Sequence, residues 1–438
     1  MDHGGQTGTG RSRPHRLIEL KRGHDVTRHF PIGFLWGAST AGHQVEGGNS
    51  NSDTWFLEQQ DPTVFREPSG AACNSYELWE TDLELAAGLG LNAYRFSVEW
   101  ARVEPRPGQF DIGALDHYEA IVDGCLDRGL APVVTFNHFT APHWFAARGG
   151  FIDDDAPATF ARYCGRVAEA FGDRMSHAVT LNEPNLHRLL DWLGLPDFVR
   201  DLERATLDGA AHAAGVEHYR VGNVVVPEDH QGMQEGLTAA HLAAVQAIKD
   251  RHHDLPVGWS IAIVDDCAVG DDTSVRDAKR AELYDHYLDV ATDDDFVGVQ
   301  NYERRWYDAD GEVVPDAQAP TNGMGSTVDP ASLGGAVRYA YERSGVPILV
   351  TEHGMHTADD RLRAAFIEPS LAGLLDAIDD RVPVLGYLHW SLMDNFEWIF
   401  GFEPQLGLMT VDRATFDRTR EPSADVYERI VRAGAVES

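Results

Sequence analysis

Two glutamates, Glu183 and Glu352, stand where carboxyl groups could act on a bound molecule. Each follows a run of apolar or β-branched residues, in the stretches VTLNEPN (179–185) and ILVTEHG (348–354). A carboxylic acid can donate a proton to a departing oxygen, and a carboxylate can act on the carbon that this oxygen leaves. Cleavage of a glycosidic bond needs this division of labour, provided that the fold brings the two carboxyl groups face to face.

Eight short apolar runs, separated by longer stretches with helical spacing, are the elements that could position these glutamates. The runs are residues 33–39, 92–97, 131–136, 177–183, 257–264, 295–302, 346–352 and 384–391. Apolar runs without strict alternation are typical of parallel strands covered on both faces, and eight β–α alternations predict an α/β fold, the (β/α)8 or TIM barrel. A doubly wound open sheet is the alternative, but no G-x-G-x-x-G follows the first run and no P-loop occurs. We predict a single barrel domain over residues 30–434, preceded by a flexible tail over residues 1–29.

Polar and aromatic residues lie at the ends of most of these runs. In a barrel, the carboxyl ends of the strands form the mouth that carries the active site. A buried polar group without a partner costs about 1 to 3 kcal/mol, so such a convergence indicates a binding site rather than a structural need. The residues are Gln44, Glu46, Arg95, Asn137, His138, Asn182, Glu183, Gln300, Tyr302, Glu352 and Trp390.

The expected neighbours of the two glutamates would give them opposite protonation states. Arg95 and Tyr302 are placed to hydrogen-bond Glu352 and to hold it ionised. The negative charge of Glu352 would in turn raise the pKa of Glu183 and keep that residue protonated. The pair would then supply one acid and one carboxylate at neutral pH.

Six motifs follow one another along nearly the whole chain: FLWGASTAGHQVEGG (34–48), YRFSVEWARVEP (94–105), VTFNHFTAPHWF (134–145), VTLNEPN (179–185), ILVTEHG (348–354) and GYLHWSLMDNFEWIFGF (386–402). Together they resemble glycoside hydrolase family 1, the β-glucosidase and β-galactosidase family. The resemblance implies a (β/α)8 barrel and a retaining double displacement. In that reaction Glu183 would be the acid/base and Glu352 the nucleophile.

The same resemblance implies a subsite for the terminal sugar. The residues implied to bind its hydroxyls are Gln44, His138, Glu397 and Trp398. Asn182 would hold the 2-hydroxyl, and Trp390 would stack on the sugar face. These residue types suit a neutral sugar, which offers hydroxyl groups and an apolar C–H face. A carboxylate at Glu397 would also repel a 6-phosphate, which disfavours phosphoglycosides.

The chain departs from the family pattern at several positions near this site. The differing residues are His43 for an aromatic residue, Phe139 for tryptophan, Gln300 for asparagine, His353 for asparagine, and Gln405 for arginine or lysine. Phe139 cannot replace the donor of an indole N–H. His353, beside the nucleophile, either shifts the pH profile or fills a supporting position. These departures leave the sugar open among glucose, galactose, fucose and xylose.

The charge of the chain restricts its partners. It has 36 Lys and Arg against 70 Asp and Glu, a formal net charge of −34. Such a surface repels nucleic acid and anionic lipid, so neither is an expected partner. Strong self-repulsion is screened at molar ionic strength, which suits a halophilic protein in a salt-rich cytoplasm. An ordinary acidic protein is the alternative.

The remaining sequence features indicate an intracellular protein without a cofactor. The four cysteines, Cys73, Cys125, Cys164 and Cys267, have no metal-like spacing and are expected to be reduced thiols. No apolar segment of signal-peptide or membrane-spanning length occurs, so a cytoplasmic location is expected. No metal site is expected, because two carboxylates complete the reaction. The sequence does not decide whether the protein forms a homo-oligomer.

Three functions fit these residues. The leading hypothesis is an exo-acting retaining β-glycosidase that hydrolyses terminal non-reducing β-D-glucosides, with galactosides and fucosides as further substrates. A transglycosylase would use the same residues and pass the sugar to an alcohol. A non-catalytic sugar-binding barrel is the third, and the retention of both Glu183 and Glu352 argues against it.

Overall fold

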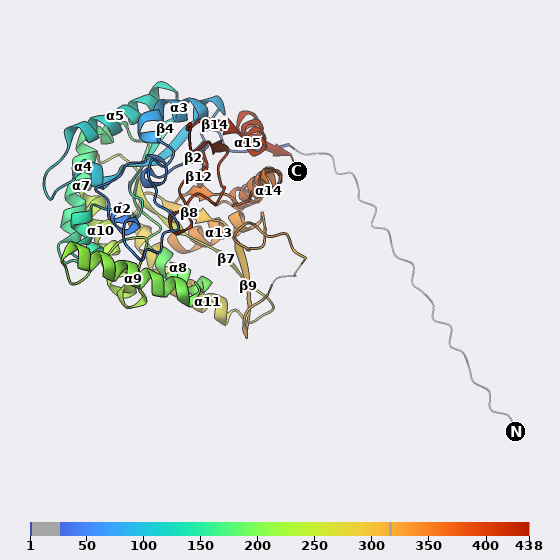
Figure 1. Ribbon diagram of the computed structural model, residues 1–438. Coiled ribbons are helices and arrows are strands. Elements are labelled where there is room, and N and C mark those ends of the chain that lie inside the picture. Colours follow the sequence, from blue (N-terminus) through green and yellow to red (C-terminus); the bar gives the residue numbers. More distant parts are fainter. Residues whose placement is uncertain (2–26, 315–317, 438) are drawn as a thin grey trace.

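The computed structural model describes Met1, residues 27–314 and residues 318–437 (Figure 1). Residues 2–26 of the predicted flexible tail lie outside this part. The last three residues of the predicted tail form strand β1 (Thr27–His29), which pairs antiparallel with β15 (Ala435–Glu437). Residues 27–29 and 435–437 therefore lie side by side.

Eight parallel strands close into a barrel in the order β11-β12-β2-β3-β4-β5-β6-β8. Their bounds are β2 (Leu35–Ser39), β3 (Ala93–Ser97), β4 (Ala131–Asn137), β5 (His177–Asn182), β6 (Val257–Ala262), β8 (Val297–Asn301), β11 (Ile348–His353) and β12 (Val384–Trp390). Each predicted apolar run supplies one of these strands. The strands are buried almost throughout, as expected where one face meets the barrel interior and the other the helices. The prediction of a single-domain (β/α)8 barrel is confirmed.

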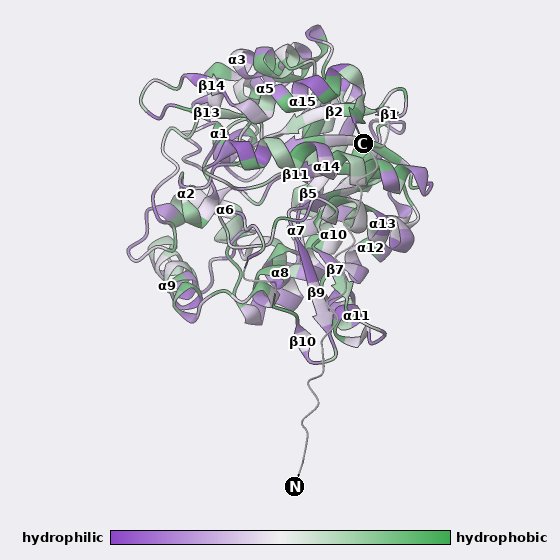
Figure 2. Cartoon of the chain, turned by 90° about the vertical axis from the view of Figure 1, so that its right-hand side faces the viewer, coloured by the Kyte–Doolittle hydropathy of each residue, from purple (hydrophilic) through white to green (hydrophobic). Residues whose placement is uncertain are grey.

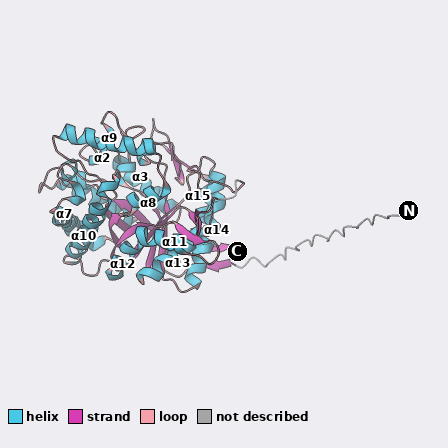
Figure 3. Cartoon of the chain, turned by 90° about the horizontal axis from the view of Figure 1, so that it is seen from below, coloured by secondary structure: helices cyan, strands magenta, loops and turns pink. Residues whose placement is uncertain are grey.

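Helices surround the barrel and cover its strands (Figure 3). The longer ones are α3 (Ser75–Gly88), α5 (Ile112–Asp127), α7 (Ala156–Phe171), α10 (His230–Lys249), α13 (Ser332–Ser344), α14 (Asp360–Asp379) and α15 (Pro422–Ala433). Local sequence sets their ends: the Asp111 side chain caps α5 by accepting from the Ala114 N–H at 3.0 Å, and α13 ends at Gly345 with φ +72°. Their apolar faces pack on the strands in one continuous core.

Further elements, most of them short, lie in the connections between barrel strands. A small sheet, β10-β9-β7, is formed by β7 (Asp265–Ala268), β9 (Arg304–Asp308) and β10 (Gly311–Glu312). The hydrophilic strand β9 stands out in Figure 2. The other elements used below are α1 (Gly42–Val45), α2 (Asp53–Glu58), α8 (Leu186–Leu193), α9 (Asp197–Ala214) and α11 (Ser274–Arg280). Within the described ranges, every helix is too short or too polar to cross a lipid bilayer.

Candidate active site

The Glu352 side chain, near the end of β11, is surrounded by hydrogen-bond donors. Its Oε1 accepts from Arg95 Nη1 at 2.6 Å and from Gln300 Nε2 at 2.8 Å, while its Oε2 accepts from the Tyr302 hydroxyl at 2.7 Å. Burial raises the pKa of Glu352, and Arg95 and Tyr302 oppose that rise. The contacts of Arg95 and Tyr302 predicted from the sequence are present, and they stabilise the ionised carboxylate.

Glu183 follows β5 and has a contrasting environment. Its backbone N–H donates to the Ser260 carbonyl at 2.8 Å, which fixes the turn beside β6. Among the described residues, its carboxyl group has no recorded hydrogen-bond partner. Burial, followed by the charge of Glu352, raises the pKa of Glu183 well above its usual range, and Arg95 only partly opposes this. Glu183 is therefore the member of the pair that keeps its proton.

The barrel brings the two glutamates close enough for the charge of Glu352 to affect the pKa of Glu183. The charge of Glu352 is the largest influence on the Glu183 pKa after burial itself. Burial raises the pKa of both groups, but Glu352 has hydrogen bonds from Arg95 and Tyr302 that oppose the rise, whereas Glu183 has only the charge of Arg95. The two carboxyl groups therefore lie in different electrostatic environments, with the pKa of Glu183 raised well above its usual range.

Asn182 and His138 extend the hydrogen-bond network from Glu352. The Asn182 Oδ1 accepts from Arg95 Nη2 at 2.5 Å and from Gln300 Nε2 at 2.7 Å, so its Nδ2 is the donor toward His138 Nε2 at 3.3 Å. Burial lowers the pKa of His138 well below its usual range, and Arg95 adds to this. A neutral His138 that accepts at Nε2 carries its proton at Nδ1. That buried N–H has no partner in the described structure and is open to a ligand oxygen.

Aromatic rings line the same region. Trp390 and His138 stack with ring centroids 5.7 Å apart, and Trp398 stacks on His138 at 6.1 Å and on His43 at 5.9 Å. Phe139 meets the Trp398 ring edge-on at 5.3 Å. Nearly parallel rings offer flat apolar surface, which suits contact with the C–H face of a sugar.

Glu397 and Gln44 complete the predicted set. The Trp390 indole N–H donates to Glu397 Oε1 at 3.3 Å. Burial raises the pKa of Glu397 to about 8, opposed by this hydrogen bond and reinforced by the charge of Glu352. Gln44 in α1 donates from Nε2 to Asn395 Oδ1 at 3.0 Å and to the Phe396 carbonyl at 2.9 Å, which leaves its buried Oε1 open. The amide of Gln44 thus offers an acceptor.

The backbone at these strand ends is unusual. Glu183, Phe139 and Trp398 have positive φ values of 45°, 69° and 49°. Such conformations are unfavourable for residues with a side chain and cluster at functional sites. Gly354, directly after β11, is required by a close approach, because a Cβ there would lie 2.0 Å from the Trp390 carbonyl oxygen. The lack of a side chain at Gly354 therefore allows the end of β11 to pack closely against the end of β12.

Three residues near the predicted site take structural positions. Glu46 does not join the network at the mouth but pairs with Arg102 at 2.7 Å and accepts from Tyr118 at 2.9 Å. The Asn137 Nδ2 donates to the Thr140 carbonyl at 2.8 Å, within its own loop. His353 is bonded to the Tyr387 hydroxyl at 2.9 Å. Burial lowers the pKa of His353 to about 3, so this histidine is neutral and fills the supporting position.

Gln300 is the residue that sequence reasoning left without a role. It was identified at a strand end and as a departure from the family pattern, yet it donates to both Glu352 and Asn182. The signal that could have found it is its place near the end of β8, two residues before Tyr302. A single sequence does not reveal where such an amide points.

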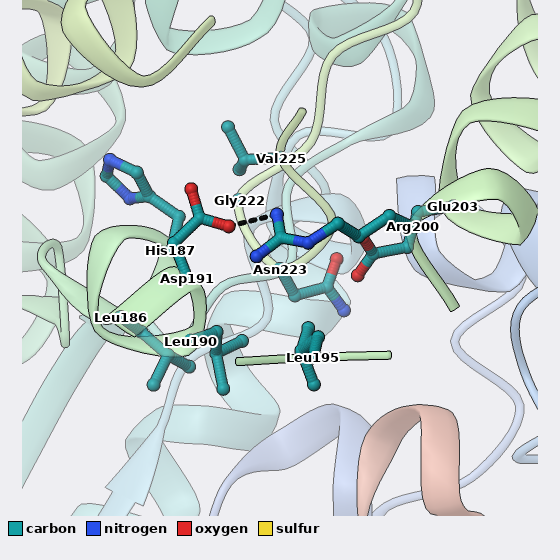
Figure 4. A pocket seen from close by; sticks show the side chains of 10 residues that line it. All are labelled: Leu186, His187, Leu190, Asp191, Leu195, Arg200, Glu203, Gly222, Asn223 and Val225. Carbon is teal, nitrogen blue, oxygen red and sulfur yellow. Dashed lines mark ion pairs between the residues drawn. The ribbon is translucent and has the colours of Figure 1, made fainter. Parts of the chain in front are cut away.

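A separate pocket lies beyond the turn at Glu183, between α8, α9 and residues 222–225 (Figure 4). Asp191 and Arg200 form an ion pair across it. It is lined by Leu186, His187, Leu190, Asp191, Leu195, Arg200, Glu203, Gly222, Asn223 and Val225, none of them in the predicted sugar site. The pocket and the two-carboxylate site are therefore different places, although the Leu186 N–H donates to the Glu183 carbonyl at 3.0 Å.

A family model, related sequences and solved structures all match most of this chain. Residues 26–435 match the model of glycosyl hydrolase family 1. A bifunctional β-D-glucosidase/β-D-fucosidase of Bifidobacterium breve is 30% identical over 93% of this chain and 99% of its own, and β-glucosidase A of Thermotoga maritima is 27% identical over 94% and 99%. The crystal structure of β-glycosidase BGL167 is 41% identical, with a TM-score of 0.87 over 92% of this chain and 97% of that one.

Proposed function

We propose, from the premise that this chain belongs to glycosyl hydrolase family 1, that it releases terminal non-reducing β-D-glucose by a retaining double displacement. The chain is a glycoside hydrolase of the β-glycosidase type. The sugar, the stereochemistry and the residue roles are the proposal. The observation that supports it is the contrast between a donor-surrounded Glu352 and a Glu183 without a recorded partner among the described residues.

In the first step Glu352 attacks the anomeric carbon and the bond to the leaving oxygen breaks. Glu183 donates its proton to that oxygen, so the aglycone leaves as a neutral alcohol. Arg95 and Tyr302 hold the Glu352 carboxylate in place for attack. The product of this step is a glycosyl ester on Glu352.

In the second step Glu183, now a carboxylate, removes a proton from water, and the water oxygen attacks the anomeric carbon. The bond to Glu352 breaks, and both glutamates return to their starting protonation states. Two inversions at the same carbon retain its configuration. Metal ions have no role in this sequence of steps.

The glycone subsite is part of the proposal. Gln44, His138, Glu397 and Trp398 bind the sugar hydroxyls, Asn182 binds the 2-hydroxyl, and Trp390 stacks on the sugar face. The open Nδ1 of His138 and the open Oε1 of Gln44 support these roles, because buried polar atoms normally find a partner. Glucose is the preferred sugar, with galactose and fucose as competing ones.

A substrate panel tests this function. Nitrophenyl β-glucoside, galactoside, fucoside, xyloside and mannoside are compared by kcat/KM, and the first sugar anomer released is identified by proton NMR. We expect turnover of the glucoside and release of the β-anomer before mutarotation. Release of the α-anomer first would mean inversion. If none of the five glycosides were hydrolysed, the proposed substrate class would be wrong.

The hydrogen bond from Tyr302 predicts a shift in pH dependence. Because this donor stabilises the ionised Glu352, Tyr302→Phe should raise the Glu352 pKa and move the acidic limb of kcat/KM to higher pH. The alkaline limb, which falls as Glu183 loses its proton, should move much less. Tyr307→Phe is the matched control, because the Tyr307 hydroxyl bonds Lys279 instead. An acidic limb that stays in place would contradict this role of Tyr302.

The net charge of −34 supports the proposal of a salt-adapted enzyme. Charge repulsion weakens the folded state at low salt, and at about 1 M salt the Debye length falls to about 3 Å. Dialysis out of molar potassium chloride should therefore lower both activity and Tm. Sucrose of equal osmolality is the control, since it screens no charge. Equal Tm values in dilute buffer and in molar salt would contradict the proposal.

A cytoplasmic location is proposed on two grounds. The four cysteines of the chain are all free thiols in the structure. Reduced cysteines are typical of the cytosol, where disulfides rarely persist. One relative, 29% identical over 93% of this chain, is the cytosolic β-glucosidase of Homo sapiens.

A further inference from the structure

The amide of Gln300 occupies a central place between the nucleophile and its neighbours. In the barrel sheet, Gln300 of β8 is the register partner of Glu352 of β11. Its Nε2 donates to Glu352 Oε1 at 2.8 Å and to Asn182 Oδ1 at 2.7 Å. Gln300 is only 1% exposed, so these contacts are made away from bulk water.

The orientation of this amide is fixed by its neighbours. Arg95 has only donors, so the Asn182 atom that it contacts at 2.5 Å must be the oxygen. The Gln300 atom facing that oxygen and the Glu352 carboxylate must then be the nitrogen. A flipped Gln300 would direct its own oxygen at two acceptors, which is repulsive. The contacts of Arg95 with Asn182 and of Asn182 with Gln300 therefore allow only one orientation of the Gln300 amide.

This orientation leaves the Gln300 Oε1 as a buried acceptor without a recorded partner in the described structure. Buried acceptors in native proteins are nearly always satisfied, so a donor is expected there when the site is in use. Within the described part of the chain, no side chain, Glu183 included, donates to this oxygen. A hydroxyl group of a bound sugar can supply this donor.

We propose that Gln300 binds the 2-hydroxyl of the sugar and at the same time positions Glu352. The inference rests on the proposed function, in which Asn182 holds that hydroxyl. A hydroxyl group donates once and accepts as well. It accepts from the Asn182 Nδ2 hydrogen that is not directed at His138, and it donates to the open Gln300 Oε1. The Glu352 Oε1 already accepts two hydrogen bonds.

A cycle of one substitution and one substrate change measures this contact. Gln300→Met keeps the length of the side chain and removes its amide. Wild type and variant are assayed on nitrophenyl β-glucoside and on its 2-deoxy analogue, and the ratio of the two kcat/KM values is compared. The loss of the Nε2 contact with Glu352 affects both substrates, so it cancels in the ratio for the variant. The intrinsic reactivity of the 2-deoxy analogue is the same for both enzymes, so it cancels when the two ratios are compared. We expect the preference for the glucoside to fall by about 10-fold or more in the variant.

Gln60→Met is the matched control, since it makes the same change at an amide outside the site, which donates to the Phe56 carbonyl at 2.6 Å. Its preference between the two substrates should equal that of wild type within about twofold. An unchanged preference in Gln300→Met, with an active wild type, would overturn the inference alone. A wild type that hydrolyses neither substrate would overturn the proposed function as well.

A second variant answers the question even if Gln300→Met does not fold. Gln300→Glu keeps an acceptor for the 2-hydroxyl, but it can donate to Glu352 only when it is protonated. Its preference for the glucoside should persist, while the alkaline limb of kcat/KM should move to lower pH, because activity is lost as the new carboxyl group ionises. A pH profile equal to that of wild type would overturn the positioning role of Gln300.

Discussion

Replacement of Glu352 by alanine is expected to lower kcat for nitrophenyl β-glucoside by at least about 10⁴-fold, because no other group can form the glycosyl-enzyme. The change also leaves the donors of Arg95, Gln300 and Tyr302 without their acceptor. Azide should enter the vacated space and restore part of the activity, and its attack from that side should yield the α-glucosyl azide. Steady-state kinetics and NMR of the product provide the measurement.

Glu303→Ala is the control for this loss. Glu303 is also buried, at 8% exposure, but it pairs with Arg305 at 3.1 Å and is not among the predicted site residues. It should keep kcat near that of wild type. Full activity of Glu352→Ala, or azide rescue that gives the β-azide, would show that another residue is the nucleophile.

Replacement of Glu183 by alanine should have an effect that depends on the leaving group. For a phenyl β-glucoside, whose leaving oxygen needs a proton, kcat/KM should fall by about 10² to 10⁴-fold. For a dinitrophenyl glucoside the fall should be much smaller, because that leaving group departs as an anion. The alkaline limb set by the raised pKa of Glu183 should also disappear, since no proton is left to lose there.

The configuration of the azide product distinguishes Glu183→Ala from Glu352→Ala. With Glu352 intact, azide can attack the glycosyl-enzyme only from the face that Glu183 occupied, so the product should be the β-glucosyl azide. An equal loss of kcat/KM for both leaving groups would contradict the role of Glu183 as proton donor. It would indicate a general disturbance of the site.

The barrel could be predicted from the sequence because its strands have a simple physical signature. Strands covered on both faces are continuously apolar, and every predicted run supplied one strand. The small sheet of β7, β9 and β10 was not predicted. The stretch DDCA of β7 and the stretch RRWYD of β9 are polar, and polar strands in a connection are not distinguished from loops by hydropathy.

The site was predictable as far as residue types and strand ends could indicate it. The contacts of Arg95 and Tyr302 with Glu352 follow from the geometry of a closed barrel. Glu46 also follows a barrel strand, but it pairs with Arg102 and accepts from Tyr118 instead of joining this network. The direction of the Gln300 amide depends on Arg95 and Asn182, which are far from it along the chain. The partners of Glu46 and the direction of the Gln300 amide are therefore determined by tertiary packing and not by local sequence.

The pairing of β1 with β15 has a practical consequence for protein engineering. Thr27 lies opposite Glu437, so the first and last strands of the described chain are already neighbours in one ladder. A short linker between them would make the backbone nearly circular, and new ends could be opened in a surface loop. Tags joined directly to Thr27 or to Glu437 would start from neighbouring positions of this ladder.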